Sequence, residues 1–166
     1  MSRRESWWTQ ELINRTMCCP MVVFLQNAWS PVYALGEWPR ASWLTALKRS
    51  RSGQRLRVLI DDFEACENTT PIVGATPNSI IPPDHKHIRA ILLRRAPRVV
   101  IACGKQAEAA LVGLWQGPLL VVPHPAHRLL TDNLYREARW LLESGRFEER
   151  LALRQARGCV NREILG

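Results

Sequence analysis

Polar residues with chemical potential follow four apolar runs of this chain, each directly where the run ends. These residues are Gln26 and Asn27, Asp61 and Asp62, Gly104 and Lys105, and His124 and His127. An amide such as Asn27 can hold and polarise a water, and a histidine such as His124 can donate a hydrogen bond to an oxygen that becomes negative. A held water opposite such a donor is suited to breaking an N-glycosidic bond.

The elements that position these residues follow from the hydrophobic pattern. The runs at residues 21–25, 99–103 and 119–122 are continuously apolar, and the run at 57–60 is apolar after Arg57. All four are too short for helices, which is typical of strands buried on both faces. Segments with apolar residues at helical spacing alternate with them, so we predict a parallel sheet covered by helices on both sides. Because ligands of such sheets bind beyond the carboxyl ends of the strands, the polar residues should share one crevice.

Length and charge limit the class of protein. The 166 residues suit one domain over the whole chain, and 23 Lys and Arg against 15 Asp and Glu give a net charge of +8. This excess suits a polyanionic partner such as nucleic acid. Three cations, Lys48, Arg49 and Arg51, lie in a stretch without acidic residues, which is either a phosphate-contacting surface or a solvated face.

Five cysteines without CxxC spacing indicate reduced thiols rather than disulfides or a metal site, and Lys105 lacks the surrounding motif of a phosphate-binding loop. We therefore expect no metal and no cofactor. The charged residues near the N-terminus interrupt any signal peptide, and no apolar run is long enough to span a membrane. These features predict a cytoplasmic, monomeric protein that does not bind membranes.

The order and spacing of the motifs resemble the uracil-DNA glycosylase superfamily. The first motif of that family, Gly-Gln-Asp-Pro-Tyr-His, is similar to residues 25–30, LQNAWS, and its closing motif, His-Pro-Ser, is similar to His124, Pro125 and Ala126. Between them, VVIACGKQAEAAL is similar to the strand, glycine and Ala-rich helix that precede the closing motif. The resemblance runs from about residue 20 to 145. It implies a three-layer α/β/α sandwich with a central four-stranded parallel sheet.

The resemblance also implies roles for single residues. Asn27 would position the hydrolytic water, His124 would stabilise the departing base, and Trp29 would form the aromatic gate. Arg128 or Leu129 would fill the gap left by a nucleotide flipped out of double-stranded DNA. The remaining residues that we expect at the base are Gln26, Asp61, Asp62 and Gly104, and those that we expect at the DNA backbone are Lys48, Arg49, Arg51, Lys105 and His127.

The departures from the family bear on the base. The family reads uracil with an Asn at the end of its second strand, and the predicted strand at 57–60 ends instead in Asp61 and Asp62. A carboxylate only accepts hydrogen bonds, so it suits the amine of a cytosine-like base. The polar loop at 67–84 can house a larger substituent. We therefore expect a glycosylase for a modified cytosine, such as glucosylated hydroxymethylcytosine in phage DNA.

Other interpretations stay open at this stage. Asp61 and Asp62 can simply cap the next segment, and the excised base can be uracil or a mismatched base, which would mean DNA repair rather than antiviral defence. The chain can also be an inactive member of the superfamily that only binds modified DNA. A small-molecule nucleoside hydrolase on the same scaffold is the third alternative, because fold does not settle function.

Overall fold

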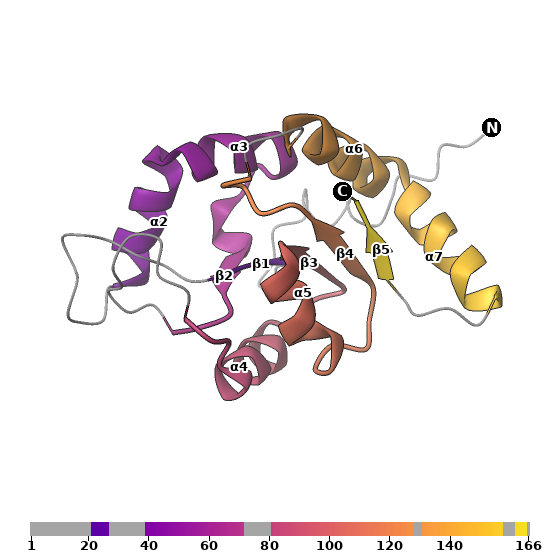
Figure 1. The fold of residues 1–166 in the computed structure, drawn as a ribbon, viewed down its shortest axis with the longest axis horizontal. Helices are drawn as coiled ribbons and strands as arrows, with labels where there is room; N and C mark the ends of the chain where they lie inside the picture. Colours follow the sequence, from indigo (N-terminus) through magenta and orange to yellow (C-terminus); the bar gives the residue numbers. More distant parts are fainter. Residues whose placement is uncertain (1–20, 27–38, 72–80, 128–130, 158–161, 166) are drawn as a thin grey trace.

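The computed structural model describes residues 21–26, 39–71, 81–127, 131–157 and 162–165. Five strands form one sheet in the order β2-β1-β3-β4-β5, and every neighbouring pair is parallel (Figure 1). The strands are β1 (Met21–Leu25), β2 (Cys66–Asn68), β3 (Val99–Cys103), β4 (Leu119–Val122) and β5 (Arg162–Ile164). Together with helices on both faces, the sheet forms an α/β/α sandwich.

One face of the sheet packs against α2 (Arg40–Arg49), α3 (Arg51–Leu59), α6 (Thr131–Ser144) and α7 (Arg146–Ala156). Alternate residues of each strand enter this core, among them Val23, Ile101 and Leu120. From the helices come side chains at helical spacing, such as Leu141 and Leu142 of α6, so each helix buries one stripe. Figure 1 shows α3 and α6 side by side along this layer, in agreement with their close packing.

The other face is covered by α4 (His85–Arg95) and α5 (Lys105–Val112). The Asp84 carboxylate caps α4 by accepting a hydrogen bond from the His87 backbone N–H at 3.1 Å, as its position before the helix predicts. The small residues Ala107 and Ala110 let α5 approach the sheet closely. The predicted strands 21–25, 99–103 and 119–122 and the covering of both faces are therefore confirmed.

The predicted strand at residues 57–60 is wrong. Residues 57–59 form the last turn of α3, whose buried side chains Leu56 and Leu59 face the core while Arg57 is exposed. A short apolar run is ambiguous between strand and buried helix, and here the helical period continues from Gly53. The second strand of the sheet is instead β2, which the predicted polar loop at 67–84 overlaps.

A fifth strand distinguishes the sheet from the four strands that we expected. Strand β5 pairs with β4, and the Leu165 backbone N–H continues the ladder to the Val121 carbonyl oxygen at 2.8 Å. Only three residues long, with a charged residue at each of its first two positions, β5 lacks the continuous apolar signal of the inner strands. The expected α/β/α class holds with one additional edge strand.

Charge pairing holds β2 at the opposite edge of the sheet. Its Glu67 is 4% exposed and forms ion pairs with Arg40 at 3.0 Å and with Arg95 at 2.8 Å. Arg40 also donates to the carbonyl oxygen of Cys66 at 2.9 Å, so α2 covers part of the free edge. A buried carboxylate is costly without such partners. The two arginines therefore tie α2 and α4 to the strand.

The corner between α2 and α3 depends on one glycine. The Ser50 hydroxyl accepts a hydrogen bond from the Gly53 backbone N–H at 3.0 Å and starts α3 directly after α2 ends. The two helices approach so closely that a Cβ added at Gly53 would lie 1.8 Å from the Leu47 carbonyl oxygen. Any side chain at position 53 must push the helices apart. The basic stretch from Lys48 thus belongs to the end of α2 and to α3.

We expect Gly53→Ala to lower the free energy of unfolding by about 1–3 kcal/mol or more, because its methyl group overlaps backbone atoms that cannot rotate away. Urea titration followed by circular dichroism measures the change. Gly113→Ala is the matched control, since a Cβ there meets nothing within 4 Å. Equal stability of the two variants would show that the corner does not depend on Gly53.

Candidate functional site

The strand ends place four positions in one row across the sheet. Strand pairing aligns Leu25 with Asn68, and Cys103 with Val122, while β1 and β3 run side by side. Leu25, Cys103 and Val122 all belong to the core under α2, α3 and α6, so Asn68 lies on that same face of the sheet. Three strand spacings of about 4.8 Å separate β2 from β4, or about 14 Å in total. Asn68, together with the residues that follow these four positions, forms the candidate site.

The turn after β4 fixes the orientation of His124. The Ala126 backbone N–H donates to His124 Nδ1 at 3.0 Å, and the His127 backbone N–H donates to the His124 carbonyl oxygen at 2.8 Å. Because Nδ1 accepts a hydrogen bond, the neutral ring carries its proton on Nε2. Burial lowers the pKa of His124 from its ordinary value of 6.5. His124 is therefore a neutral imidazole that offers Nε2–H as a donor.

Gly104 makes room for this histidine. It has a φ of +93°, and a Cβ added to it would lie 3.1 Å from His124 Cβ. Its backbone N–H extends the β3–β4 ladder by donating to the Val122 carbonyl oxygen at 2.8 Å. Helix α5 opens directly after Gly104, and no side chain of the described residues caps its N-terminus. The N-terminus of a helix favours an anion, and that of α5 lies beside His124.

The tip of β2 is a cluster of buried polar residues. Asn68 is 1% exposed, Thr69 is 0% exposed and Thr70 is 2% exposed. Thr69 is anchored, since its hydroxyl donates to the Gln26 carbonyl oxygen at 2.6 Å and its backbone N–H donates to the Leu25 carbonyl oxygen at 2.9 Å. Asn68 Nδ2 and Thr70 Oγ1 have no hydrogen-bond partner within the described parts of the chain. Buried groups of this kind call for an explanation, and a polar ligand supplies one.

The structure brings several of the sequence-predicted residues to this edge. Gln26, Gly104, Lys105, His124 and His127 all follow the carboxyl ends of β1, β3 and β4. Lys105 and His127 are exposed, while the other three are half-buried. Four further predicted residues, Asn27, Trp29, Arg128 and Leu129, lie outside the described residues. Their roles stay predictions.

Asp61 and Asp62 do not lie at a strand end, which corrects their predicted position directly after a strand. They follow α3, and the Asp61 carboxylate is 73% exposed and paired with Arg139 of α6 at 2.7 Å. Asp62 caps the short helix that follows, accepting from the Glu64 backbone N–H at 3.0 Å. The capping alternative therefore holds for Asp62. The residue at the end of the second strand is Asn68, which the strand error concealed.

The three predicted basic residues lie on α2 and α3, and the nearby Arg55 of α3 reaches the turn after β4. Lys48 and Arg49 end α2, Arg51 begins α3, and all three are exposed. Arg55 follows Arg51 by one helical turn on the same side of α3. Its guanidinium donates to the carbonyl oxygens of the turn at Pro125, at 3.0 Å, and at His127. Lys48, Arg49, Arg51 and Arg55, called the basic stripe below, thus follow one another along α2 and α3, and Arg55 reaches the turn that carries the histidine.

The described cysteines take no part in this site. Burial raises the pKa of the Cys66 thiol to about 12 and raises the pKa of Cys103 further. Both thiols are free and buried. Neither is a thiolate near neutral pH, so neither can act as a nucleophile.

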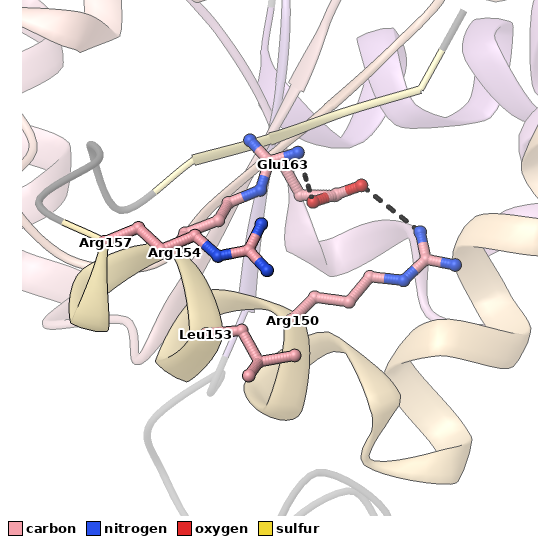
Figure 2. Close-up of a pocket in the computed structure, with 5 residues that line it drawn as sticks. All are labelled: Arg150, Leu153, Arg154, Arg157 and Glu163. Atoms are coloured by element: carbon pink, nitrogen blue, oxygen red, sulfur yellow. Dashed lines mark hydrogen bonds and ion pairs between the residues drawn. The ribbon is translucent and has the colours of Figure 1, made fainter.

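A polar cleft of about 300 Å³ lies away from these residues, between α7 and β5 (Figure 2). Glu163, 5% exposed, pairs there with Arg150 at 3.2 Å and with Arg154 at 2.9 Å. Arg154 also donates to the Arg162 carbonyl oxygen at 2.7 Å. These bonds attach α7 to the edge strand β5, just as the bonds of Arg40 attach α2 to the edge strand β2. We assign this cluster to the stability of the sheet edge.

This chain matches no protein-family model, no curated protein and no solved structure. Among the described residues, none of the helices has the length and hydrophobicity needed to cross a membrane.

The lowered pKa of His124 predicts a pH dependence. Nuclear magnetic resonance (NMR) titration of the folded protein should give His124 a midpoint below 6.5, and the urea-unfolded chain should give about 6.5. Because the folded-state pKa is the lower one, this residue's contribution to stability is complete above pH 6.5 and is lost as the pH falls through the folded-state pKa. A folded-state midpoint at or above that of the unfolded chain would contradict the described environment of the ring.

Proposed function

We propose that this protein is a monofunctional DNA glycosylase, which hydrolyses the N-glycosidic bond of a base flipped out of duplex DNA and leaves an abasic site. One observation carries the proposal. His124, whose Nδ1 accepts a hydrogen bond and whose Nε2 therefore carries the proton, follows the end of β4, and Asn68, a buried amide whose Nδ2 has no partner among the described residues, ends β2, so both lie at the carboxyl edge of the sheet. The two groups have the chemistry needed to hold a planar polar base from two sides.

In this proposal His124 stabilises the leaving group. A water held by Asn27 attacks the sugar carbon, and the bond to the base nitrogen breaks with its electron pair moving onto the base. The His124 Nε2–H donates to the base oxygen on which negative charge develops, and one such donor is worth about 10²–10³ in rate. The water's oxygen ends on the sugar, and its second proton neutralises the base.

The departure from the family's closing motif is compatible with this role. Ala126 stands where the family has serine, but the group that orients His124 is the backbone N–H of residue 126. A side-chain hydroxyl is not needed for that hydrogen bond. The alanine therefore leaves the neutral donor form of the histidine intact.

Asn68 is the proposed base-reading residue, in place of Asp61. The resembling family reads uracil with an Asn at the end of its second strand, the place that Asn68 occupies here. An amide donates through Nδ2 and accepts through Oδ1, which matches O4 and N3–H of uracil. Since the argument for a cytosine-like base rested on Asp61, we propose uracil as the base and keep modified cytosine as the tested alternative.

We expect matched duplexes to reveal the base. Duplexes that carry uracil, cytosine, 5-hydroxymethylcytosine or its glucosylated form are incubated with the protein and then with alkali, which cuts abasic sites. Cleavage should occur at uracil, and His124→Ala should lose about 10²–10³ in single-turnover rate. Cleavage at a modified cytosine alone would reject the uracil assignment, and no cleavage anywhere would reject the glycosylase and favour a binding-only protein.

Variants of the two candidate base readers separate them. Asn68→Asp should shift the preference from uracil towards cytosine by about 10–100-fold, because a carboxylate cannot donate to O4. Asp61→Asn is the matched control, and it should leave the preference unchanged because that carboxylate pairs with Arg139 on the surface. If Asp61→Asn changed the base preference and Asn68→Asp did not, Asp61 rather than Asn68 would be the base-reading residue.

The basic stripe predicts how binding responds to salt. Each of Lys48→Gln, Arg49→Gln and Arg51→Gln should reduce the slope of log affinity against log salt by about 0.9 if its cation neutralises one phosphate. Fluorescence anisotropy with a duplex at several salt concentrations measures the slope. Arg89→Gln on α4 is the control, since α4 covers the opposite face of the sheet. Salt-independent binding by the wild type would instead support the small-molecule hydrolase.

A further inference from the structure

A single arginine bridges the turn that carries the proposed leaving-group histidine. Arg55 Nη1 donates to the Pro125 carbonyl oxygen at 3.0 Å and also to the His127 carbonyl oxygen. The residues in this contact are 70 and 72 positions apart in the chain, so α3 and the turn meet only in the folded protein. Both bonds come from the same guanidinium nitrogen, which fixes the spacing of the two carbonyl groups.

The bridged carbonyl groups flank the hydrogen bond that sets the His124 ring. Ala126 lies between Pro125 and His127, and its backbone N–H is the donor to His124 Nδ1 at 3.0 Å. If the turn opens, this N–H leaves the ring and nothing selects the Nε2–H form. Arg55 therefore acts on the histidine through the backbone and does not need to touch a substrate.

A second bond holds the start of the turn. The Tyr135 hydroxyl of α6 donates to the Pro123 carbonyl oxygen at 2.6 Å. Arg55 and Tyr135 thus attach the turn to two helices that pack against each other. The α2–α3 corner at Gly53 lies two residues before Arg55 on the same helix.

We propose that Arg55 is the positioning residue of His124: it holds the turn of residues 123–127 so that the Ala126 N–H keeps the imidazole in its Nε2–H form. The catalytic consequence of this role rests on the proposed function, but the structural role does not. Since one nitrogen makes both bonds, a lysine ammonium with three donors can replace the guanidinium. A side chain without a donor cannot.

Nitrogen-15 NMR of the histidine side chains in the full chain tests the proposal. Wild type and Arg55→Lys should show His124 with its proton on Nε2, and Arg55→Met should show a mixture of both neutral forms. Arg57→Met is the matched control, because Arg57 lies on the same helix over the Phe63 ring at 5.2 Å. It should match wild type. A wild-type spectrum of His124 in folded Arg55→Met would overturn the proposal.

If Arg55→Met does not fold, Arg55→Gln gives the same comparison, because its side chain is too short to reach both carbonyl groups. An Nε2–H form retained in Arg55→Gln would overturn the proposal equally. Single-turnover cleavage of the uracil duplex then adds the catalytic readout. Misplacement of the ring should cost Arg55→Met about 10²-fold in rate, with Arg55→Lys restoring it. If the His124 tautomer changes in Arg55→Met but the wild type cleaves no duplex, the role of Arg55 is upheld and the proposed function is rejected.

Discussion

The burial of a parallel sheet on both faces is the constraint on which the rest of this structure depends. Strands β1, β3 and β4 carry only buried residues, so helices must cover each side. Every connection between parallel strands returns to the amino edge of the sheet. The carboxyl ends of all the strands therefore lie at the opposite edge. The polar residues that follow the strands meet there because the core requires it, before any chemistry is considered.

At that edge, the candidate site depends on interactions from outside the sheet. Arg40 and Arg95 hold the buried Glu67 of β2 and so fix the strand that ends in Asn68. Arg55 and Tyr135 hold the turn that carries His124. The two proposed base contacts lie on strands separated by β1 and β3, so neither group can position the other. Their relation is set by the sheet register and by these helix-borne side chains.

The sequence predicted the bounds of the apolar strands β1, β3 and β4 to the residue, but it did not predict the polar edge strands β2 and β5. A continuous apolar run such as 99–103 is stable only when it is buried, so its sequence predicts a buried strand. Strand β2 has the sequence Cys-Glu-Asn, and its burial depends on arginines distant in the sequence. The run at 57–60 misled because the buried stripe of α3 ends with adjacent apolar residues, Leu59 and Ile60. The sequence singled out His124 and Gly104 because they come within two residues of the end of an apolar strand.

The sequence analysis did not propose Asn68 because it did not predict strand β2. As a consequence it assigned the contact with the base to Asp61. The available signal was the polar trio Asn68, Thr69 and Thr70 directly before Pro71, in the stretch where the resembling family requires an Asn. Arg55 could not be found from sequence at all, since its partners lie 70 residues away. Contacts of that range exist only once α3 and the turn after β4 are folded together.

The central claim is that Asn68 and His124 bind one flipped base from two sides. The most direct test is NMR of the protein bound to a duplex with one 2′-fluoro-deoxyuridine, a nucleotide that resists hydrolysis. The account predicts that the Asn68 side-chain amide and the His124 Nε2–H both shift on binding this duplex and not on binding an unmodified one. Identical spectra of these two groups in both complexes would contradict it.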